Sequence, residues 1–187
     1  MSTVSLYHVG YDEIRKPDVH YGRKNADFGQ GFYLSPNKDF SVRWARQRKG
    51  QNTFLNSYEL DTDGLKIKTL DRNVEWYEYI FRNRNGFEDN CPDCDVIIGP
   101  IANDTIYDTL GIITSGFLSE KNSLRLLMVG PAYIQVALKT EKASDQLKWL
   151  STEVLDPAEI EKYRNIVVEE EKEYQALFAE EFAKLEL

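Results

Sequence analysis

One segment constrains the fold of this chain more than any other, and it reads Asp27-Phe28-Gly29-Gln30-Gly31-Phe32-Tyr33-Leu34-Ser35. Two glycines two positions apart let the backbone turn and approach neighbouring atoms closely, because neither carries a Cβ. A short strand is expected over residues 31–35. Ser35-Pro36 then favours an N-cap followed by proline at the first helical position, which predicts a helix over residues 36–49. Such a turn, strand and helix can hold an aromatic ring over a flat ligand.

Further strands and helices are indicated by hydrophobic periodicity along the rest of the chain. Strands are expected over residues 3–9, 54–60, 65–67, 95–101 and 133–140, and helices over 75–84, 103–114 and 119–129. Strands and helices mix without regular βα alternation, which favours the α+β class. The 187 residues, 42% of them hydrophobic, suit a single folded domain.

The C-terminal part differs from the rest because it is acidic and helical from Asp156 to Leu187. We therefore divide the chain into a domain over residues 1–150 and a helical extension over residues 151–187. Apolar residues recur at three-four spacing in this extension, so it either packs on its own domain or contacts a partner protein or second copy. Its carboxylate-rich face argues against membrane association.

The net charge of −8 disfavours nonspecific binding to nucleic-acid phosphates. The chain starts Met1-Ser2-Thr3-Val4 and runs directly into a strand pattern, so no signal peptide is expected. No apolar run approaches the roughly 20 residues that span a bilayer. These features predict a cytoplasmic protein.

The only two cysteines, Cys91 and Cys94, form a single CxxC pair. One pair supplies two zinc ligands rather than four, and the motif precedes a strand instead of opening a helix. A plain loop and a redox or metal role both stay open, and no metal site is predicted.

A second short segment, Leu6-Tyr7-His8-Val9-Gly10, ends a strand with a histidine and a further close-approach glycine. Together with the segment over residues 27–35 it resembles the NAD-binding core of poly(ADP-ribose)-polymerase-like and diphtheria-toxin-like ADP-ribosyltransferases. The resemblance spans roughly residues 4–150, where the chain is similar to a bacterial family of uncharacterised domains grouped with these enzymes. It implies an ADP-ribosyltransferase-like split β-sandwich of two small antiparallel sheets with flanking helices.

The resemblance implies a role in NAD binding for residues of these two segments and of the following helix. His8 would hold the adenosine ribose, the Val9–Gly10 backbone and Ser41 would hold the carboxamide, and Tyr33 and Trp44 would sandwich the nicotinamide ring. Gly31 and Phe32 complete the expected NAD-binding set: His8, Val9, Gly10, Gly31, Phe32, Tyr33, Ser41 and Trp44.

The resemblance implies a catalytic set of His8, Tyr33 and Gln135, where the polymerase-like enzymes that the chain resembles carry His, Tyr and Glu. Glutamine keeps the hydrogen-bonding geometry of glutamate but lacks its negative charge. Because electrostatic stabilisation is often the largest catalytic term, this departure argues against polymer elongation and leaves mono-ADP-ribosyl transfer. A Gln135→Glu variant of raised activity would support a weakened enzyme.

The resemblance implies an NAD-dependent mono-ADP-ribosyltransferase of the bacterial toxin or effector type, with NAD as co-substrate. The acceptor is expected to be protein rather than nucleic acid, and a small antitoxin is a possible partner. Alternatives are an NAD glycohydrolase and a noncatalytic module that binds NAD, ADP-ribose or protein. An RNA 2′-phosphotransferase is disfavoured because the chain is acidic and has only two histidines.

Two further polar groups are noted. Arg23 and Lys24 are either solvated side chains or contacts to the pyrophosphate. Asn103-Asp104 is either a helix N-cap or part of the cleft rim.

Overall fold

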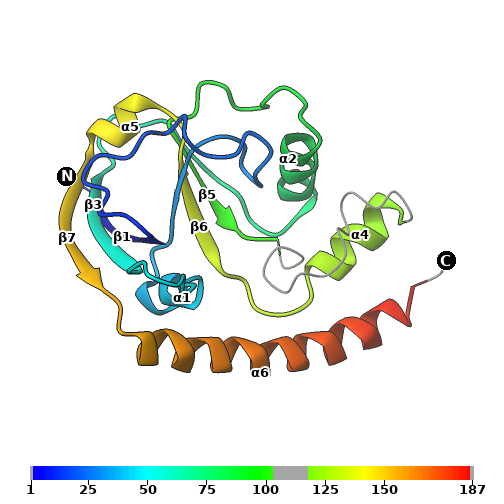
Figure 1. The fold of residues 1–187 in the computed structure, drawn as a ribbon. Helices are drawn as coiled ribbons and strands as arrows, with labels where there is room; N and C mark the ends of the chain where they lie inside the picture. Colours follow the sequence, from blue (N-terminus) through cyan, green and yellow to red (C-terminus); the bar gives the residue numbers. More distant parts are fainter. Residues whose placement is uncertain (1, 103–117, 186–187) are drawn as a thin grey trace.

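The computed structural model of the protein describes residues 2–102 and 118–185, and it shows a mixed α+β domain with two small sheets (Figure 1). The strands are β1 (Thr3–Gly10), β2 (Phe32–Leu34), β3 (Phe54–Asp61), β4 (Ile67–Thr69), β5 (Val96–Pro100), β6 (Ile134–Leu138) and β7 (Leu147–Val154). The helices are α1 (Lys38–Arg43), α2 (Val74–Arg84), α4 (Glu120–Leu127), α5 (Glu141–Asp145) and α6 (Pro157–Phe182). The helix expected over residues 103–114, with Asn103-Asp104, lies outside the described residues.

The first sheet has the order β1-β3-β7, and all of its pairs are antiparallel. The sequence pattern predicts neither β7 nor the short α5 before it, and it places the last strand at residues 133–140. β7 is an edge strand with mostly exposed or half-buried side chains, and Leu150 interrupts the alternation. Edge strands of this kind lack the buried apolar face that marks a strand in sequence. β7 also continues through residue 150, where the sequence predicts the domain boundary.

The second sheet has the order β2-β6-β5-β4. β2, β6 and β5 pair antiparallel, but β4 pairs parallel to β5, so this sheet is mixed rather than antiparallel as expected. α2 lies in the connection between β4 and β5, which is the kind of crossover that parallel pairing needs. The two sheets meet where the backbone groups of Tyr7 and Ser35 exchange two hydrogen bonds of 2.9 Å.

Apolar residues from both sheets form one core cluster between them, centred on Leu6, Tyr58, Val96 and Leu138. A second cluster fills the space between the β5–β6 side and the helices, and includes the fully buried Trp76 of α2. The indole N–H of Trp76 donates to the carbonyl of Pro100 at 2.8 Å. These contacts fix α2 on the second sheet.

α1 is shorter than the helix expected over residues 36–49, because it ends at Arg43 with Trp44 as its C-cap. Its N-cap is Asn37, whose side chain accepts from the amide of Phe40 at 2.9 Å. Ser35 lies two residues earlier, and its hydroxyl oxygen accepts from the amide of Asn37 at 3.1 Å. The sequence therefore predicted the helix start to within two residues but not its end.

α6 runs along one side of the domain, first beside α1 and then toward α4 (Figure 1). Arg43 of α1 forms an ion pair with Glu170 at 2.5 Å, and Arg125 of α4 forms one with Glu181 at 2.5 Å. Tyr174 is buried, so the helix contributes apolar as well as ionic contacts. Within residues 2–102 and 118–185, no helix is long and apolar enough to cross a membrane.

Candidate functional site

The two glycines of the segment Asp27–Ser35 permit close approach of the backbone to its neighbours. Gly29 has φ +74°, and a Cβ there would lie 2.9 Å from Oδ1 of Asn83. A Cβ on Gly31 would lie 2.6 Å from the carbonyl oxygen of Leu138, its neighbour across the sheet. Both contacts are too short for a side-chain carbon, so the turn that precedes β2 requires glycine at these positions.

A cleft of about 570 Å³ opens where β1, β2, α1 and β6 meet. This volume falls within the range of roughly 300–1,000 Å³ that is typical of small-molecule sites. Six of the residues predicted for NAD binding or catalysis line it together: His8, Val9, Tyr33, Ser41, Trp44 and Gln135. The other lining residues are Tyr7, Arg23, Asn25, Ala26, Asp27, Leu34, Ser35, Phe40, Arg84 and Ile101.

His8 is held at the cleft by a hydrogen bond from its Nδ1 to the carbonyl oxygen of Tyr33, at 2.8 Å. A carbonyl only accepts, so Nδ1 carries the proton and Nε2 of the neutral ring is left as an acceptor. Desolvation lowers the pKa of His8, although the bond to Tyr33 opposes this shift. The ring also lies 4.6 Å, centroid to centroid, from Phe32. At neutral pH, His8 therefore presents an uncharged acceptor suited to a hydroxyl group.

The phenol of Tyr33 is tied to the glycine turn. Its hydroxyl donates to the carbonyl of Gly29 at 2.6 Å and accepts from the amide of Phe28 at 3.0 Å. Burial raises the pKa of Tyr33 above its ordinary value, so the phenol stays neutral. The hydroxyl is thus occupied by the backbone, and the ring is what Tyr33 offers to a ligand in the cleft.

Ser41 and Trp44 reach the cleft from α1. The hydroxyl of Ser41 donates to the carbonyl of Asn37 at 3.0 Å, which leaves its oxygen able to accept from a ligand. Trp44 is 37% exposed, and its ring meets Phe40 edge to face with centroids 5.8 Å apart. An indole held by one edge contact and open to solvent offers a face on which a flat ring can stack.

Gly10, Gly31 and Phe32 were predicted as binding residues, but the structure gives them packing contacts instead. A Cβ on Gly10 would approach Nε2 of His8 to 3.2 Å, so this glycine makes room for the imidazole. Gly31 lies against β6, and Phe32 is 8% exposed in the core between the sheets. Because β-strand side chains alternate, Phe32 points away from the face on which Tyr33 lies.

A buried polar cluster at the cleft is not predicted by the sequence. Asp27 is 7% exposed, and its Oδ1 accepts from Nε and Nη2 of Arg84, both at 2.8 Å. Its Oδ2 accepts from the amide of Ala102 at 3.2 Å and lies 3.5 Å from Nε2 of Gln135. Asp27 heads the glycine segment, but no sequence signal connects it with Arg84, which lies at the end of α2, 57 residues further along the chain.

No group of three or more histidine, cysteine or acidic side chains arranged to hold a metal ion occurs in the described ranges 2–102 and 118–185. Cys91 and Cys94 form a disulfide that closes a turn before β5. The turn lies outside the cleft lining.

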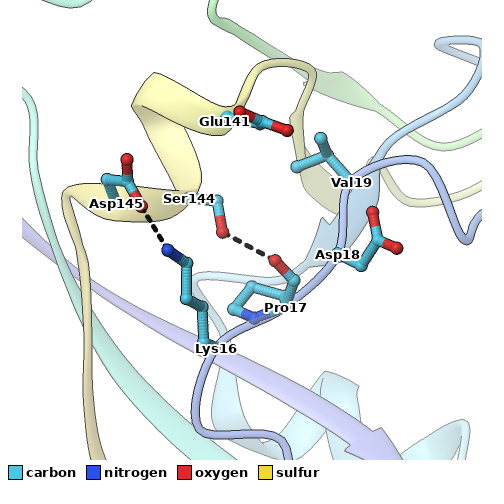
Figure 2. A pocket seen from close by; sticks show the side chains of 7 residues that line it. All are labelled: Lys16, Pro17, Asp18, Val19, Glu141, Ser144 and Asp145. Carbon is cyan, nitrogen blue, oxygen red and sulfur yellow. Dashed lines mark hydrogen bonds and ion pairs between the residues drawn. The ribbon is translucent and has the colours of Figure 1, made fainter.

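A second cavity, of about 340 Å³, lies between the segment Lys16–Val19 and α5 (Figure 2). Two pairs of lining residues bind each other: Ser144 donates to the carbonyl of Pro17 at 2.7 Å, and Lys16 forms an ion pair with Asp145 at 2.7 Å. None of the residues predicted for binding or catalysis lines it. The first cleft is therefore the better candidate site.

Fold and site together define a mixed α+β domain with an aromatic and polar cleft at the junction of its two sheets. The chain belongs to the family described as Protein of unknown function (DUF3990), whose sequence model matches residues 4–149. No curated protein matches the chain.

Proposed function

We propose that the protein is an NAD-dependent mono-ADP-ribosyltransferase with an ADP-ribosyltransferase-like split β-sandwich. One observation carries this proposal. Six of the predicted residues line one cleft, although they come from β1, β2, α1 with its C-cap, and β6: His8, Val9, Tyr33, Ser41, Trp44 and Gln135. They are six of the nine residues that the resemblance to ADP-ribosyltransferases selects for NAD binding and catalysis.

The chemistry of the cleft suits each part of NAD. The nicotinamide ring of NAD is cationic, so the open indole of Trp44 can attract it by about 0.5–2 kcal/mol, with the ring of Tyr33 as the second aromatic surface. Its carboxamide needs an acceptor and a donor, which the Ser41 hydroxyl and the Val9 backbone supply. The neutral Nε2 of His8 can accept from a ribose hydroxyl.

Arg23 also lines the cleft and brings a positive charge to it. A guanidinium is suited to the pyrophosphate of NAD, because it can donate two parallel hydrogen bonds to phosphate oxygens. Lys24, its neighbour in the chain, is absent from the residues that line the cleft.

In the proposed reaction, the bond between nicotinamide and ribose breaks, nicotinamide leaves with the bonding electron pair, and C1 of the ribose gains oxocarbenium character. A nucleophile of the acceptor then attacks this carbon and loses its proton. Gln135, 8% exposed at the cleft, would hold a hydroxyl of the nicotinamide ribose. With water as the acceptor the same steps give NAD hydrolysis.

The biological setting is part of the proposal. The resemblance points to a bacterial toxin or effector that works in the cytoplasm and has a small antitoxin as partner. The net charge of −8 favours a protein acceptor over a nucleic acid, since the surface repels phosphates at long range.

A noncatalytic NAD- or ADP-ribose-binding module is the second candidate, and the uncharged Gln135 favours it. The test is incubation of the protein with NAD labelled in the adenylate part, with and without a bacterial lysate. Transfer predicts label on a macromolecule and free nicotinamide, and hydrolysis predicts free ADP-ribose. Intact NAD in every sample, despite saturable NAD binding, would leave the binding module as the function.

Trp44→Ala is the variant for this assay, because Trp44 is partly exposed and its loss leaves no buried cavity. Tyr21→Ala is the matched control, since Tyr21 is an aromatic residue that is 92% exposed and lies outside the cleft lining. We expect the label to be lost with Trp44→Ala and retained with Tyr21→Ala. Equal labelling by both variants would contradict the proposed site.

A further inference from the structure

We propose that Asp27 is a positioning residue that fixes the side-chain amide of Gln135 so that its carbonyl oxygen faces the cleft. This inference rests on the proposed function, because it assigns a partner to the residue that would hold the nicotinamide ribose. The observation behind it is the approach of Oδ2 of Asp27 to Nε2 of Gln135, at 3.5 Å. Both side chains are buried, at 7% and 8% exposed, and both line the cleft.

The charge of Asp27 determines which end of the amide it faces. An ionised carboxylate only accepts hydrogen bonds, so the amide nitrogen of Gln135 turns toward it and the amide oxygen turns away. A free glutamine can present either group to a ligand. With its nitrogen held by Asp27, Gln135 offers an acceptor to the cleft, as a glutamate would.

Asp27 is itself held in place from two directions. Arg84 at the end of α2 binds Oδ1 through two nitrogens, and the amide of Ala102 binds Oδ2. In addition, the side-chain amide of Asn83 donates to the Asp27 carbonyl at 3.2 Å. Hydrogen bonds in such a chain polarise one another, so the bond to Asp27 also strengthens the amide oxygen of Gln135 as an acceptor. Arg84 and Asp27 thereby position Gln135 on β6, although both lie far from it in the sequence.

The contact between Asp27 and Gln135 is tested by NMR, from the side-chain amide signals of ¹⁵N-labelled protein. The Gln135 signal is identified as the pair of peaks missing from Gln135→Glu. We expect this pair to move in Asp27→Asn, because asparagine at position 27 replaces the charged acceptor. Asp95→Asn is the matched control: Asp95 is also 7% exposed, but it bonds to Lys66 and Thr140 outside the cleft. Gln135 peaks that stay in place in Asp27→Asn would overturn the inference.

The functional part is tested by nicotinamide release from NAD. We expect Asp27→Asn to lower kcat about tenfold with little change in KM, and Asp27→Asn combined with Gln135→Glu to recover most of that loss. A purely structural role of Asp27 predicts no recovery in the double variant, and that result would overturn the inference. The proposed function has its own test: it fails if the wild-type protein neither binds NAD nor releases nicotinamide. In that case the amide signals still decide whether Asp27 holds Gln135.

Discussion

Glutamate at position 135 should destabilise this protein at neutral pH, although it is the residue that the proposed function would favour at this position. The new carboxylate would lie about where Nε2 of Gln135 lies, 3.5 Å from Oδ2 of Asp27. Two unit charges at this separation repel by about 5 kcal/mol at an effective dielectric constant of about 20. Arg84 is paired with the other oxygen of Asp27 and offsets part of this repulsion.

The protein can relieve the repulsion by binding a proton, as paired carboxyl groups commonly do. At pH 7 this costs about 1.4 kcal/mol for each pH unit above the ordinary glutamate pKa of about 4.3, or about 3.7 kcal/mol. We therefore expect the free energy of unfolding of Gln135→Glu to be about 2–4 kcal/mol lower than that of wild type at pH 7. A carboxyl group whose pKa is raised on folding destabilises the folded protein progressively as the pH rises above the pKa of that group in the unfolded chain. The loss of unfolding free energy in Gln135→Glu should therefore fall below about 1 kcal/mol at pH 4.5.

The assay is urea unfolding of Gln135→Glu and wild type at pH 7 and pH 4.5, compared at each pH. Gln51→Glu is the matched control, because Gln51 is exposed in the loop before β3 and the same charge change should leave stability within about 0.5 kcal/mol. A Gln135→Glu protein as stable as wild type at both pH values would refute the reasoning, since position 135 would then not face a carboxylate. Stability restored by the added Asp27→Asn change would support it.

Three other predictions follow from single contacts. Wild type should lose stability relative to His8→Gln as pH falls below 6.5. The pKa of His8 is lower in the folded protein than in the unfolded chain, so binding of a proton favours unfolding. Urea unfolding of both proteins from about pH 7.5 to 5 measures this difference. Gly31→Ala should cost about 1–3 kcal/mol in urea unfolding, since its Cβ would meet the carbonyl of Leu138, and unchanged stability would contradict the close approach. Glu170→Gln should weaken its bond to Arg43 by about 1–3 kcal/mol and speed hydrogen exchange in α6, whereas unchanged exchange would mean that other contacts hold this helix.

The segment around Asp27–Ser35 was the most predictable part of the site, because its glycines, strand and helix start depend on local chemistry. The strand β2 and a helix soon after Ser35 both appear. Trp44 also lies beside Ser41 at the cleft, although α1 is only six residues long. Local signals suffice where one short segment supplies several residues that line the cleft.

Contacts between distant segments could not be predicted in this way. Arg84 reaches Asp27 only because α2 packs on the second sheet, and nothing in its own sequence context marks it as part of a cleft. Likewise, β7 is stabilised by its pairing with β3. Its side chains do not form the regular buried face that would mark a strand in the sequence. Gly31 and Phe32 belong to the same segment, Asp27–Ser35, but Gly31 lies against β6 and Phe32 lies in the core rather than in the cleft lining.

The most direct test of the account is a calorimetric titration of NAD into wild type, Trp44→Ala and Tyr21→Ala. Tyr33→Ala is less suitable, because the hydroxyl of Tyr33 bonds to Phe28 and Gly29, and its loss would disturb the turn as well as the cleft. We predict saturable binding to wild type and to Tyr21→Ala, and binding at least tenfold weaker to Trp44→Ala. Absence of NAD binding to the folded wild-type protein would contradict the central claim that this cleft is an NAD site.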